Sequence, residues 1–105
     1  MLYILYCKDN PRVSVHVRTM HKEAHLAYLA DHAGLIVLGG AMLDEDGETR
    51  VGSTLILNVG SRAEAEAFSV NEPFRRAGLY ASVDIIRMRR AQWRPELAPQ
   101  SVDGK

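Results

Sequence analysis

The chain has 105 residues, enough for one domain with a single core, because a chain of this size buries roughly 65% of the surface that its unfolded form exposes. Apolar residues make up 47% and charged residues 25%, proportions that are typical of a globular protein and exclude a mainly disordered one. The 13 basic residues match the 13 acidic ones, so no basic excess indicates nucleic acid or an anionic membrane as a partner.

The sequence carries no sign of export or of a membrane anchor. No apolar stretch approaches the roughly 20 residues that cross a bilayer, and no basic segment precedes an apolar run near the start. The single cysteine, Cys7, cannot form an internal disulfide, and a free cysteine is more often a small buried residue than a nucleophile. We therefore expect a soluble protein of the reducing cytoplasm.

The first part of the chain predicts a strand and then a long helix. Residues 1–7 are mostly aliphatic or aromatic, and the polar residues 8–10 with Pro11 form a turn signal. From 13 to 33 apolar residues recur at intervals of three and four, and Gly34 follows as a helix stop. The valines within 13–17 also alternate as in a strand, so the sequence leaves the first turn of this helix open.

The middle of the chain predicts two strands joined by a hairpin. The apolar run 35–43 contains two adjacent glycines, Gly39 and Gly40, which indicate a bulge or a close backbone approach. A polar turn at 44–48 includes an Asp-Gly pair, which is a hairpin signal. The next strand covers 51–59, where side chains alternate between two faces of a sheet.

The last part predicts a capped helix, a short turn and a final strand. Ser61 and Glu64 have the spacing of a capping box and open a helix. Proline at 73 ends that helix or starts a new one, because it fixes φ and restrains the residue before it. Residues 80–88 alternate as a fourth strand. Its simple alternation groups Tyr80, Ser82, Asp84 and Ile86 on one face.

The order of these elements, βαββαβ, predicts an α+β ferredoxin-like fold, in which two helices cover one face of a four-stranded antiparallel sheet. We expect one domain over residues 1–93 and a flexible tail over 94–105, which contains two prolines. Neighbouring strand residues such as Ile85 and Ile86 make both sheet faces apolar. An apolar face is rarely left in water, so we expect a homodimer with its two sheets face to face and a cleft in each protomer.

Several short motifs resemble the YciI-like (YCII-related) family, and the resemblance covers residues 1 to about 90. The motifs carry the resemblance through their order and spacing: Met1-Leu2-Tyr3, Arg18 seven residues before His25, His25-Leu26-Ala27-Tyr28-Leu29, Gly40-Ala41-Met42, Gly52-Ser53-Thr54 and Glu72-Pro73-Phe74. The sequence departs from the family pattern at Ala41, where the family has proline, and at Glu72, where it has aspartate.

The resemblance implies a dimeric α+β barrel related to muconolactone isomerase, with a histidine and a carboxylate as the active pair. In this chain His25 and Glu72 take those two positions. An imidazole has an ordinary pKa of about 6.5, and a carboxylate on one ring nitrogen fixes the tautomer and raises the basicity of the other nitrogen. Such a pair can abstract a proton beside a carbonyl or assist the loss of a leaving group, so we expect an isomerase or a lyase that needs no cofactor.

Three further residues are candidates for binding a small, anionic, aromatic-derived substrate. Arg18 lies close to two helical turns before His25, on the same face, and could orient a carboxylate or phenolate. Tyr28, three residues beyond His25, could donate a hydrogen bond to the same ligand. Gly40 could line the cleft with its backbone.

Two alternatives remain open at the level of the sequence. His21, His25 and His32 align on one helical face, but a zinc site needs a further ligand that no motif supplies, so we expect no metal. The second alternative is a non-catalytic dimer that binds a small metabolite or acts as an accessory protein. The sequence has no nucleophile elbow, phosphate-cradling loop or redox motif that would compel chemistry.

Overall fold

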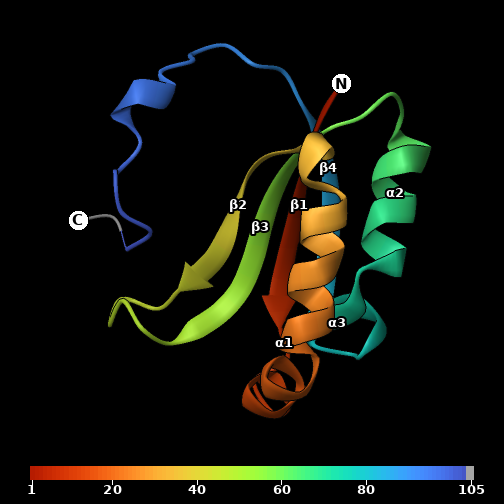
Figure 1. The fold of residues 1–105 in the computed structure, drawn as a ribbon, viewed down its shortest axis with the longest axis vertical. Coiled ribbons are helices and arrows are strands. Elements are labelled where there is room, and N and C mark those ends of the chain that lie inside the picture. The colour runs from red at the N-terminus through yellow and green to blue at the C-terminus, as the bar shows by residue number, and fades with distance from the viewer. Residues whose placement is uncertain (104–105) are drawn as a thin grey trace.

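The computed structural model describes residues 1–103, which form the architecture of Figure 1. The elements are β1 (Leu2–Asp9), α1 (Ser14–Asp31), the 3-10 turn η1 (Ala33–Leu35), β2 (Ile36–Leu43), β3 (Arg50–Asn58), α2 (Arg62–Asn71), α3 (Pro73–Arg76), β4 (Tyr80–Met88) and the 3-10 turn η2 (Pro95–Leu97). This order confirms the ferredoxin-like prediction, with the single turn α3 inserted before the last strand. The open question about residues 13–17 is settled, because Ser14 already begins the helix.

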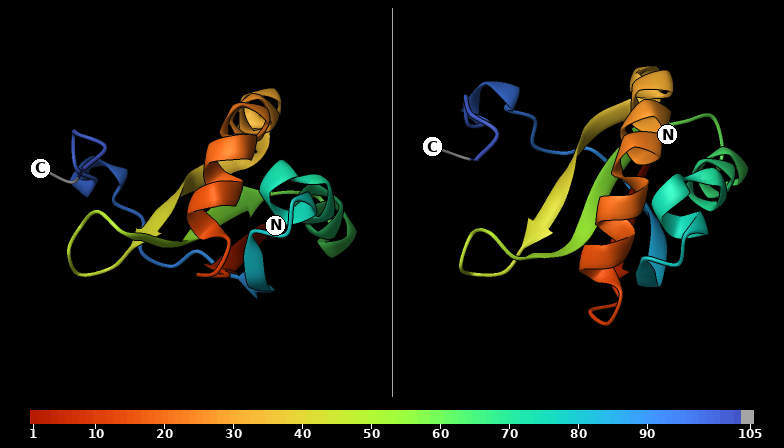
Figure 2. Two further views of the ribbon diagram at one scale, coloured as in Figure 1. Left: turned by 90° about the horizontal axis from the view of Figure 1, so that it is seen from below. Right: turned by 60° about the horizontal axis from the view of Figure 1, so that its bottom comes forward.

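The four strands form one antiparallel sheet in the order β2-β3-β1-β4. The register pairs Leu5 of β1 with Leu55 of β3 on one side and with Ile85 of β4 on the other. Side chains of paired residues lie on the same face, so these three point together toward the helices. Figures 1 and 2 show α1 and α2 packed on that one face of the sheet.

The core lies between the sheet and its helices, as the period of two in β1 dictates. Its odd-numbered residues are buried beneath the helices while Lys8 is exposed. The main cluster joins them to residues of β3 and α2: Tyr3, Leu5, Cys7, Leu57, Val59, Ala65 and Phe68. A smaller cluster of Val17, Phe74 and Leu79 joins α1 to α3, and it supports the site described below.

The N-terminus of α2 shows how a local signal fixes one of these helices. The Ser61 side chain accepts a hydrogen bond from the backbone N–H of Glu64 at 3.2 Å, as the capping prediction requires. The Glu64 carboxylate accepts in turn from the N–H of Gly60, one residue before the expected partner. The cap therefore closes one residue further out than a standard capping box.

The opposite face of the sheet carries no helix in the part of the chain that the structure describes. Leu38 is 64% exposed on β2 and Ile86 is 51% exposed on β4. The register places them on the face of Ile4 and Ile56, away from the core. This apolar face is the one on which the dimer expectation depends.

The C-terminal segment leaves the sheet after β4 and arcs toward the β2 side of the molecule (Figure 1). Trp93 is 50% exposed and Leu97 is 77% exposed, so neither belongs to the core. The flexible tail that the sequence predicts covers 94–105, of which residues 104–105 lie outside the described part. None of the helices within residues 1–103 has the length and apolarity needed to span a bilayer.

Candidate active site

The site begins with Glu72, which is 4% exposed and serves as the N-cap of α3. Its carboxylate accepts hydrogen bonds from the backbone N–H groups of Phe74 at 3.1 Å and Arg75 at 3.3 Å. Pro73 occupies the first turn, where its missing N–H costs nothing. The backbone of the Glu-Pro-Phe segment therefore helps to hold a buried carboxylate in place.

His25 of α1 meets this carboxylate. Its Nδ1 is in hydrogen-bond contact with Oε1 of Glu72, and the two side chains are 15% and 5% exposed. An ionised carboxylate only accepts hydrogen bonds, so Nδ1 of His25 donates. In the neutral ring Nε2 is then the nitrogen that can take a proton. The structure thus brings together the two residues that the sequence paired.

Phe74 packs against one face of the His25 imidazole. The rings of His25 and Phe74 stack with their centroids 3.9 Å apart and their planes 13° apart. Phe74 is 2% exposed, and the Arg18 guanidinium lies 5.3 Å from its ring centroid. Because the stacked ring and the Glu72 contact restrain two different directions, His25 is fixed in both tilt and rotation.

Arg18 is bound within the protein. Its Nε and Nη2 donate to Asp9 at 2.9–3.1 Å, and Nη2 also donates to the carbonyl oxygen of Gly52 at 3.3 Å. Asp9 is 8% exposed and also accepts from the Ser14 hydroxyl at 2.8 Å. Arg18 lines the pocket described next, as expected, but Asp9 compensates its charge.

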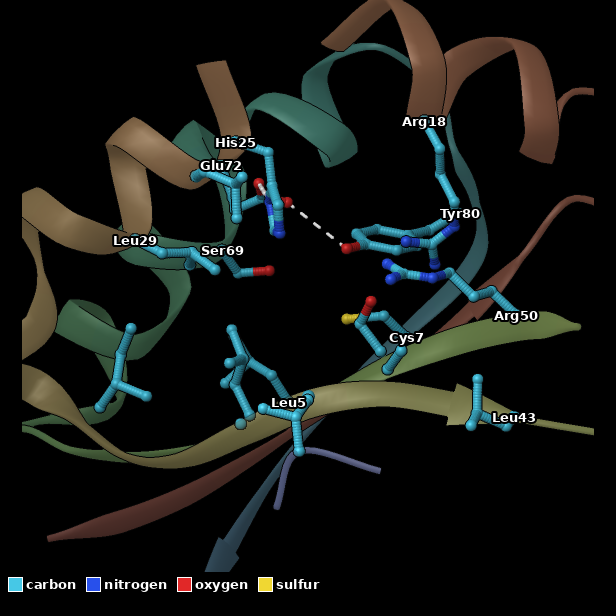
Figure 3. A pocket seen from close by; sticks show the side chains of 18 of the residues that line it. Leu5, Cys7, Arg18, His25, Leu29, Leu43, Arg50, Ser69, Glu72 and Tyr80 are labelled. Carbon is cyan, nitrogen blue, oxygen red and sulfur yellow. Dashed lines mark hydrogen bonds and ion pairs between the residues drawn. The ribbon is translucent and has the colours of Figure 1, made fainter. Parts of the chain in front are cut away.

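A pocket of about 1100 Å³ lies under α1, on the side of β2 and β3 (Figure 3). His25 and Glu72 line one wall together with Tyr80, and Leu5, Cys7 and Leu55 are among its apolar lining. On the side of the sheet, Gly40 of β2 and Arg50 of β3 also line the pocket. Gly40 is thus one of the lining residues, and the mixture of apolar and polar groups is typical of a small-molecule site.

The Tyr28 side chain is directed elsewhere. Its hydroxyl donates to the backbone carbonyl of Phe68 at 2.8 Å, and its ring lies 5.2 Å from that of Phe68. Three residues turn a helix by about 300°, which rotates Tyr28 away from His25 and toward α2. Tyr28 is therefore absent from the described lining of the pocket, and the structure does not bring it to the other candidates.

Tyr80 is a pocket residue that the sequence did not single out as a candidate. Its hydroxyl lies 3.5 Å from Oε2 of Glu72 (Figure 3). Burial, with a smaller effect from the negative charge of Glu72, raises the pKa of Tyr80 above its ordinary value, so the hydroxyl stays protonated as a donor. A register shift between Lys8 and Asp9 places Tyr80 opposite Asp9 on the helix-covered face. The alternation that grouped Tyr80 with Ser82 is thereby corrected.

The remaining polar candidates do not form a metal centre. Nδ1 of His32 bonds to the backbone carbonyl of Tyr28 at 2.7 Å, while His25 is engaged by Glu72. Across residues 1–103 no group of three or more His, Cys, Asp or Glu side chains is placed to hold a metal ion. Burial raises the pKa of the Cys7 thiol to about 12, which makes it a poor nucleophile at neutral pH.

Comparison with known proteins relates this chain to a protein family and to individual proteins. A family model described as the YCII-related domain matches residues 1–89. The structure of 5-chloro-2-hydroxyhydroquinone dehydrochlorinase (TftG) from Burkholderia phenoliruptrix AC1100, a complex with 2,5-dihydroxybenzoquinone, is 36% identical and covers 87% of this chain and 96% of that chain, with a TM-score of 0.78. A shikimate kinase of Streptomyces coelicolor is 38% identical over 79 residues, or 73% of this chain, which spans 42% of that relative's length.

Proposed function

Because the chain belongs to the YCII-related family, we propose that it is a small enzyme that uses His25 as a general base and Glu72 as its partner. The reaction class is proton abstraction that leads to isomerisation or to loss of a leaving group such as chloride. The single observation that carries the proposal is the contact between Nδ1 of His25 and the buried carboxylate of Glu72, beside a pocket. It leaves Nε2 as the base.

The proposed chemistry follows from that nitrogen. Nε2 of His25 takes a proton from the substrate, and the electron pair left behind moves toward an adjacent carbonyl or into a new double bond. In an elimination the leaving group departs with its bonding pair, and in an isomerisation the same proton returns at another carbon. Glu72 stabilises the imidazolium that forms in between, and this kind of catalysis contributes typically 10²- to 10⁴-fold to a rate.

The comparison with TftG favours a small oxygenated ring as the substrate. That protein is named as a dehydrochlorinase of a chlorinated hydroxyhydroquinone, and it shares 36% identity over 87% of this chain. Kinase activity is not carried over from the shikimate kinase, of which the chain spans 42%. The sequence lacks the Gly-rich loop with lysine that cradles phosphate in P-loop kinases.

The test uses His25→Ala, with His16→Ala as the matched control because His16 is exposed on the same helix. Purified proteins are assayed for chloride release from 5-chloro-2-hydroxyhydroquinone and for turnover of a panel of lactones and muconolactones. We expect His25→Ala to lose at least 100-fold in kcat and His16→Ala to keep wild-type activity. If 2,5-dihydroxybenzoquinone stabilises every form but none turns over any substrate, the alternative of a binding module is correct.

We further propose that the protein is a homodimer in the cytoplasm. Leu38 and Ile86 are more than half exposed on the bare sheet face, and pairing two such faces removes both from water. The free thiol of Cys7 suits a reducing compartment. Light scattering is expected to give twice the monomer mass for the wild type and the monomer mass for Ile86→Asp, while Glu66→Gln on α2 stays dimeric. A monomeric wild type would contradict this proposal.

A further inference from the structure

We infer that Arg50 anchors an ionised oxygen of the substrate, and that the substrate class is a phenolate, enolate or carboxylate whose charge lies away from the proton taken by His25. This inference rests on the proposed function and adds the specificity residue to it. Arg50 is the first residue of β3 and lines the same pocket as the dyad. Figure 3 shows its side chain reaching inward near Tyr80 and Cys7, across from His25.

Two arginines line the pocket, Arg18 and Arg50. Arg18 makes an ion pair with Asp9 at 2.9 Å and is 12% exposed, so an incoming anion meets a neutralised pair. Arg50 is exposed, and its guanidinium makes no hydrogen bond or ion pair with the residues that the structure describes. Of the two cations, Arg50 is therefore the one whose full charge and planar set of donors are available to a ligand.

Four acids line the pocket: Asp46 and Glu48 in the hairpin before Arg50, Glu72 of the dyad, and Asp103 of the C-terminal segment. Asp46 accepts hydrogen bonds from the backbone N–H groups of Glu48 and Thr49, so its carboxylate caps its own turn. Glu48 also lines the pocket, and an anion bound at Arg50 would be repelled by it. Removing the charge of Glu48 should therefore raise the affinity for an anion, whereas removing the charge of Arg50 should lower it. The inference requires both effects.

The dyad itself offers no competing anchor. Glu72 carries negative charge, and its two oxygens already face the donors of His25, Phe74, Arg75 and Tyr80. An anion placed near Glu72 would meet like charge, so the charged end of the substrate is directed to the far side of the pocket. The neutral, reacting end is then left beside Nε2 of His25, as the proposed chemistry requires.

The experiment is isothermal titration calorimetry of the full chain with 2,5-dihydroxybenzoquinone, whose hydroxyls are vinylogous acids that ionise at neutral pH. Its dimethyl ether, which has no ionisable group, is the neutral probe. We expect Arg50→Gln to weaken binding of the anionic probe by about tenfold, because a hydrogen bond to a charged group is lost. Its affinity for the neutral probe should change less than twofold. Arg50→Lys should keep part of the affinity for the anionic probe that Arg50→Gln loses, and Glu48→Gln should bind this probe more tightly than the wild type.

Controls separate this inference from the catalytic proposal. Arg12→Gln removes a charge from the exposed start of the chain and should bind as the wild type does. His25→Ala should still bind the anionic probe through Arg50 even though its turnover is lost. The inference is overturned if the anionic probe fails to bind the wild type, or if it binds Arg50→Gln equally well. Loss of turnover in Arg50→Gln with unchanged binding would also contradict it.

Discussion

Two sides of one pocket are built in different ways. The closed wall, His25 with Glu72 and Tyr80, has buried or nearly buried polar groups, and each is held by a partner within the protein. The open wall, Gly40 with Arg50, is exposed and has no side-chain partner among the residues described. This difference matches two requirements of an active site. Proton transfer needs groups that are fixed before the substrate arrives, and recognition needs groups that are still free to bind it.

The closed wall owes its order to short-range structure. Glu72 is fixed by the backbone of α3, whose Phe74 in turn stacks on His25. The open wall begins at the hairpin between β2 and β3, where no helix covers the strands. We expect sequence changes at Arg50 to alter ligand binding without disturbing the contact between His25 and Glu72, since Arg50 and the dyad lie on different elements.

The largest expected effect is at Glu72. Glu72→Gln keeps the size of the side chain but replaces the carboxylate by an amide, so Nδ1 of His25 loses a charged acceptor and the imidazolium its counter-charge. We expect kcat to fall by about 1000-fold, within the range for general acid–base catalysis. Turnover of the substrate found in the His25 assay is the measurement, with the exposed Glu66→Gln of α2 as the control.

Glu72→Gln also tests the comparison of the two walls. Binding of the anionic probe is expected to be equal to or tighter than in the wild type, because the change removes like charge from the pocket. A variant that turns over within threefold of the wild type would show that the closed wall does not carry the chemistry. Circular dichroism checks that the fold survives the weakened cap, which is worth about 1 kcal/mol.

The second effect concerns Cys7 in the pocket. Its pKa is raised from 9.0 to about 12, with burial as the main cause, so at pH 8 the thiolate fraction falls by about three powers of ten. We expect iodoacetamide to modify the native protein at least 100-fold more slowly than the urea-unfolded chain, as followed by mass spectrometry. Rapid modification of the native protein would mean that water and reagent reach Cys7 freely, which would contradict its burial.

The raised pKa of Cys7 also makes the free energy of unfolding depend on pH. From about pH 9 upward the thiol ionises in the unfolded chain, while in the folded protein it stays protonated until about pH 12. The unfolded state thus releases a proton that the folded state keeps, and the free energy of unfolding falls across this range. Tyr80, whose pKa burial also raises, contributes in the same direction. A Cys7→Ala variant should lose less stability on going to high pH.

Much of the fold was predictable because its signals are local. The period of two in β1 and the cap at Ser61 each depend on a few neighbouring residues, and the structure has both. The family motifs likewise placed His25 and Glu72, which lie 47 residues apart in the chain, in one pair. That pairing came from the family resemblance, whereas the strand and cap signals need no distant partner to be recognised.

Parts of the site depend on partners that no local pattern reveals. Arg18 was expected to meet a ligand, and the structure pairs it with Asp9, nine residues earlier, at the end of a strand. Tyr28 was expected in the pocket, but its hydroxyl bonds to Phe68 of α2. Tyr80 was missed because a bulge in β4, where Ala81 has no partner on β1, breaks the alternation of that strand. Each difference arises from tertiary packing, which composition and spacing do not encode.

The third effect concerns the cost of adding a side chain at two glycines of the sheet, Gly52 of β3 and Gly40 of β2. A Cβ added at Gly52 would collide with the carbonyl oxygen of Cys7, whereas one added at Gly40 meets nothing within 4 Å. Gly52 also offers its carbonyl to Arg18. We expect Gly52→Ala to lower the free energy of unfolding by about 2 kcal/mol, as overpacking does, and Gly40→Ala to change it by less than about 0.5 kcal/mol. Urea denaturation measures both, and equal costs would contradict the close backbone approach at Gly52.

The smallest effect tests whether stacking, rather than hydrogen bonding alone, fixes the base. Phe74→Leu keeps a buried apolar side chain and the backbone N–H that Glu72 accepts, but it removes the flat surface against the His25 ring. We expect kcat to fall about tenfold with KM nearly unchanged, because the loss is in the orientation of the base.

Phe68→Leu is the matched control for that change, since Phe68 is also buried but stacks on other rings. Both variants should lose similar stability, about 1–2 kcal/mol, from the smaller side chain. A structural role for Phe74 would lower both activities through unfolding and leave kcat per folded molecule intact. An orienting role lowers kcat only in Phe74→Leu, because that ring alone of the two restrains the imidazole that Glu72 holds from the other direction.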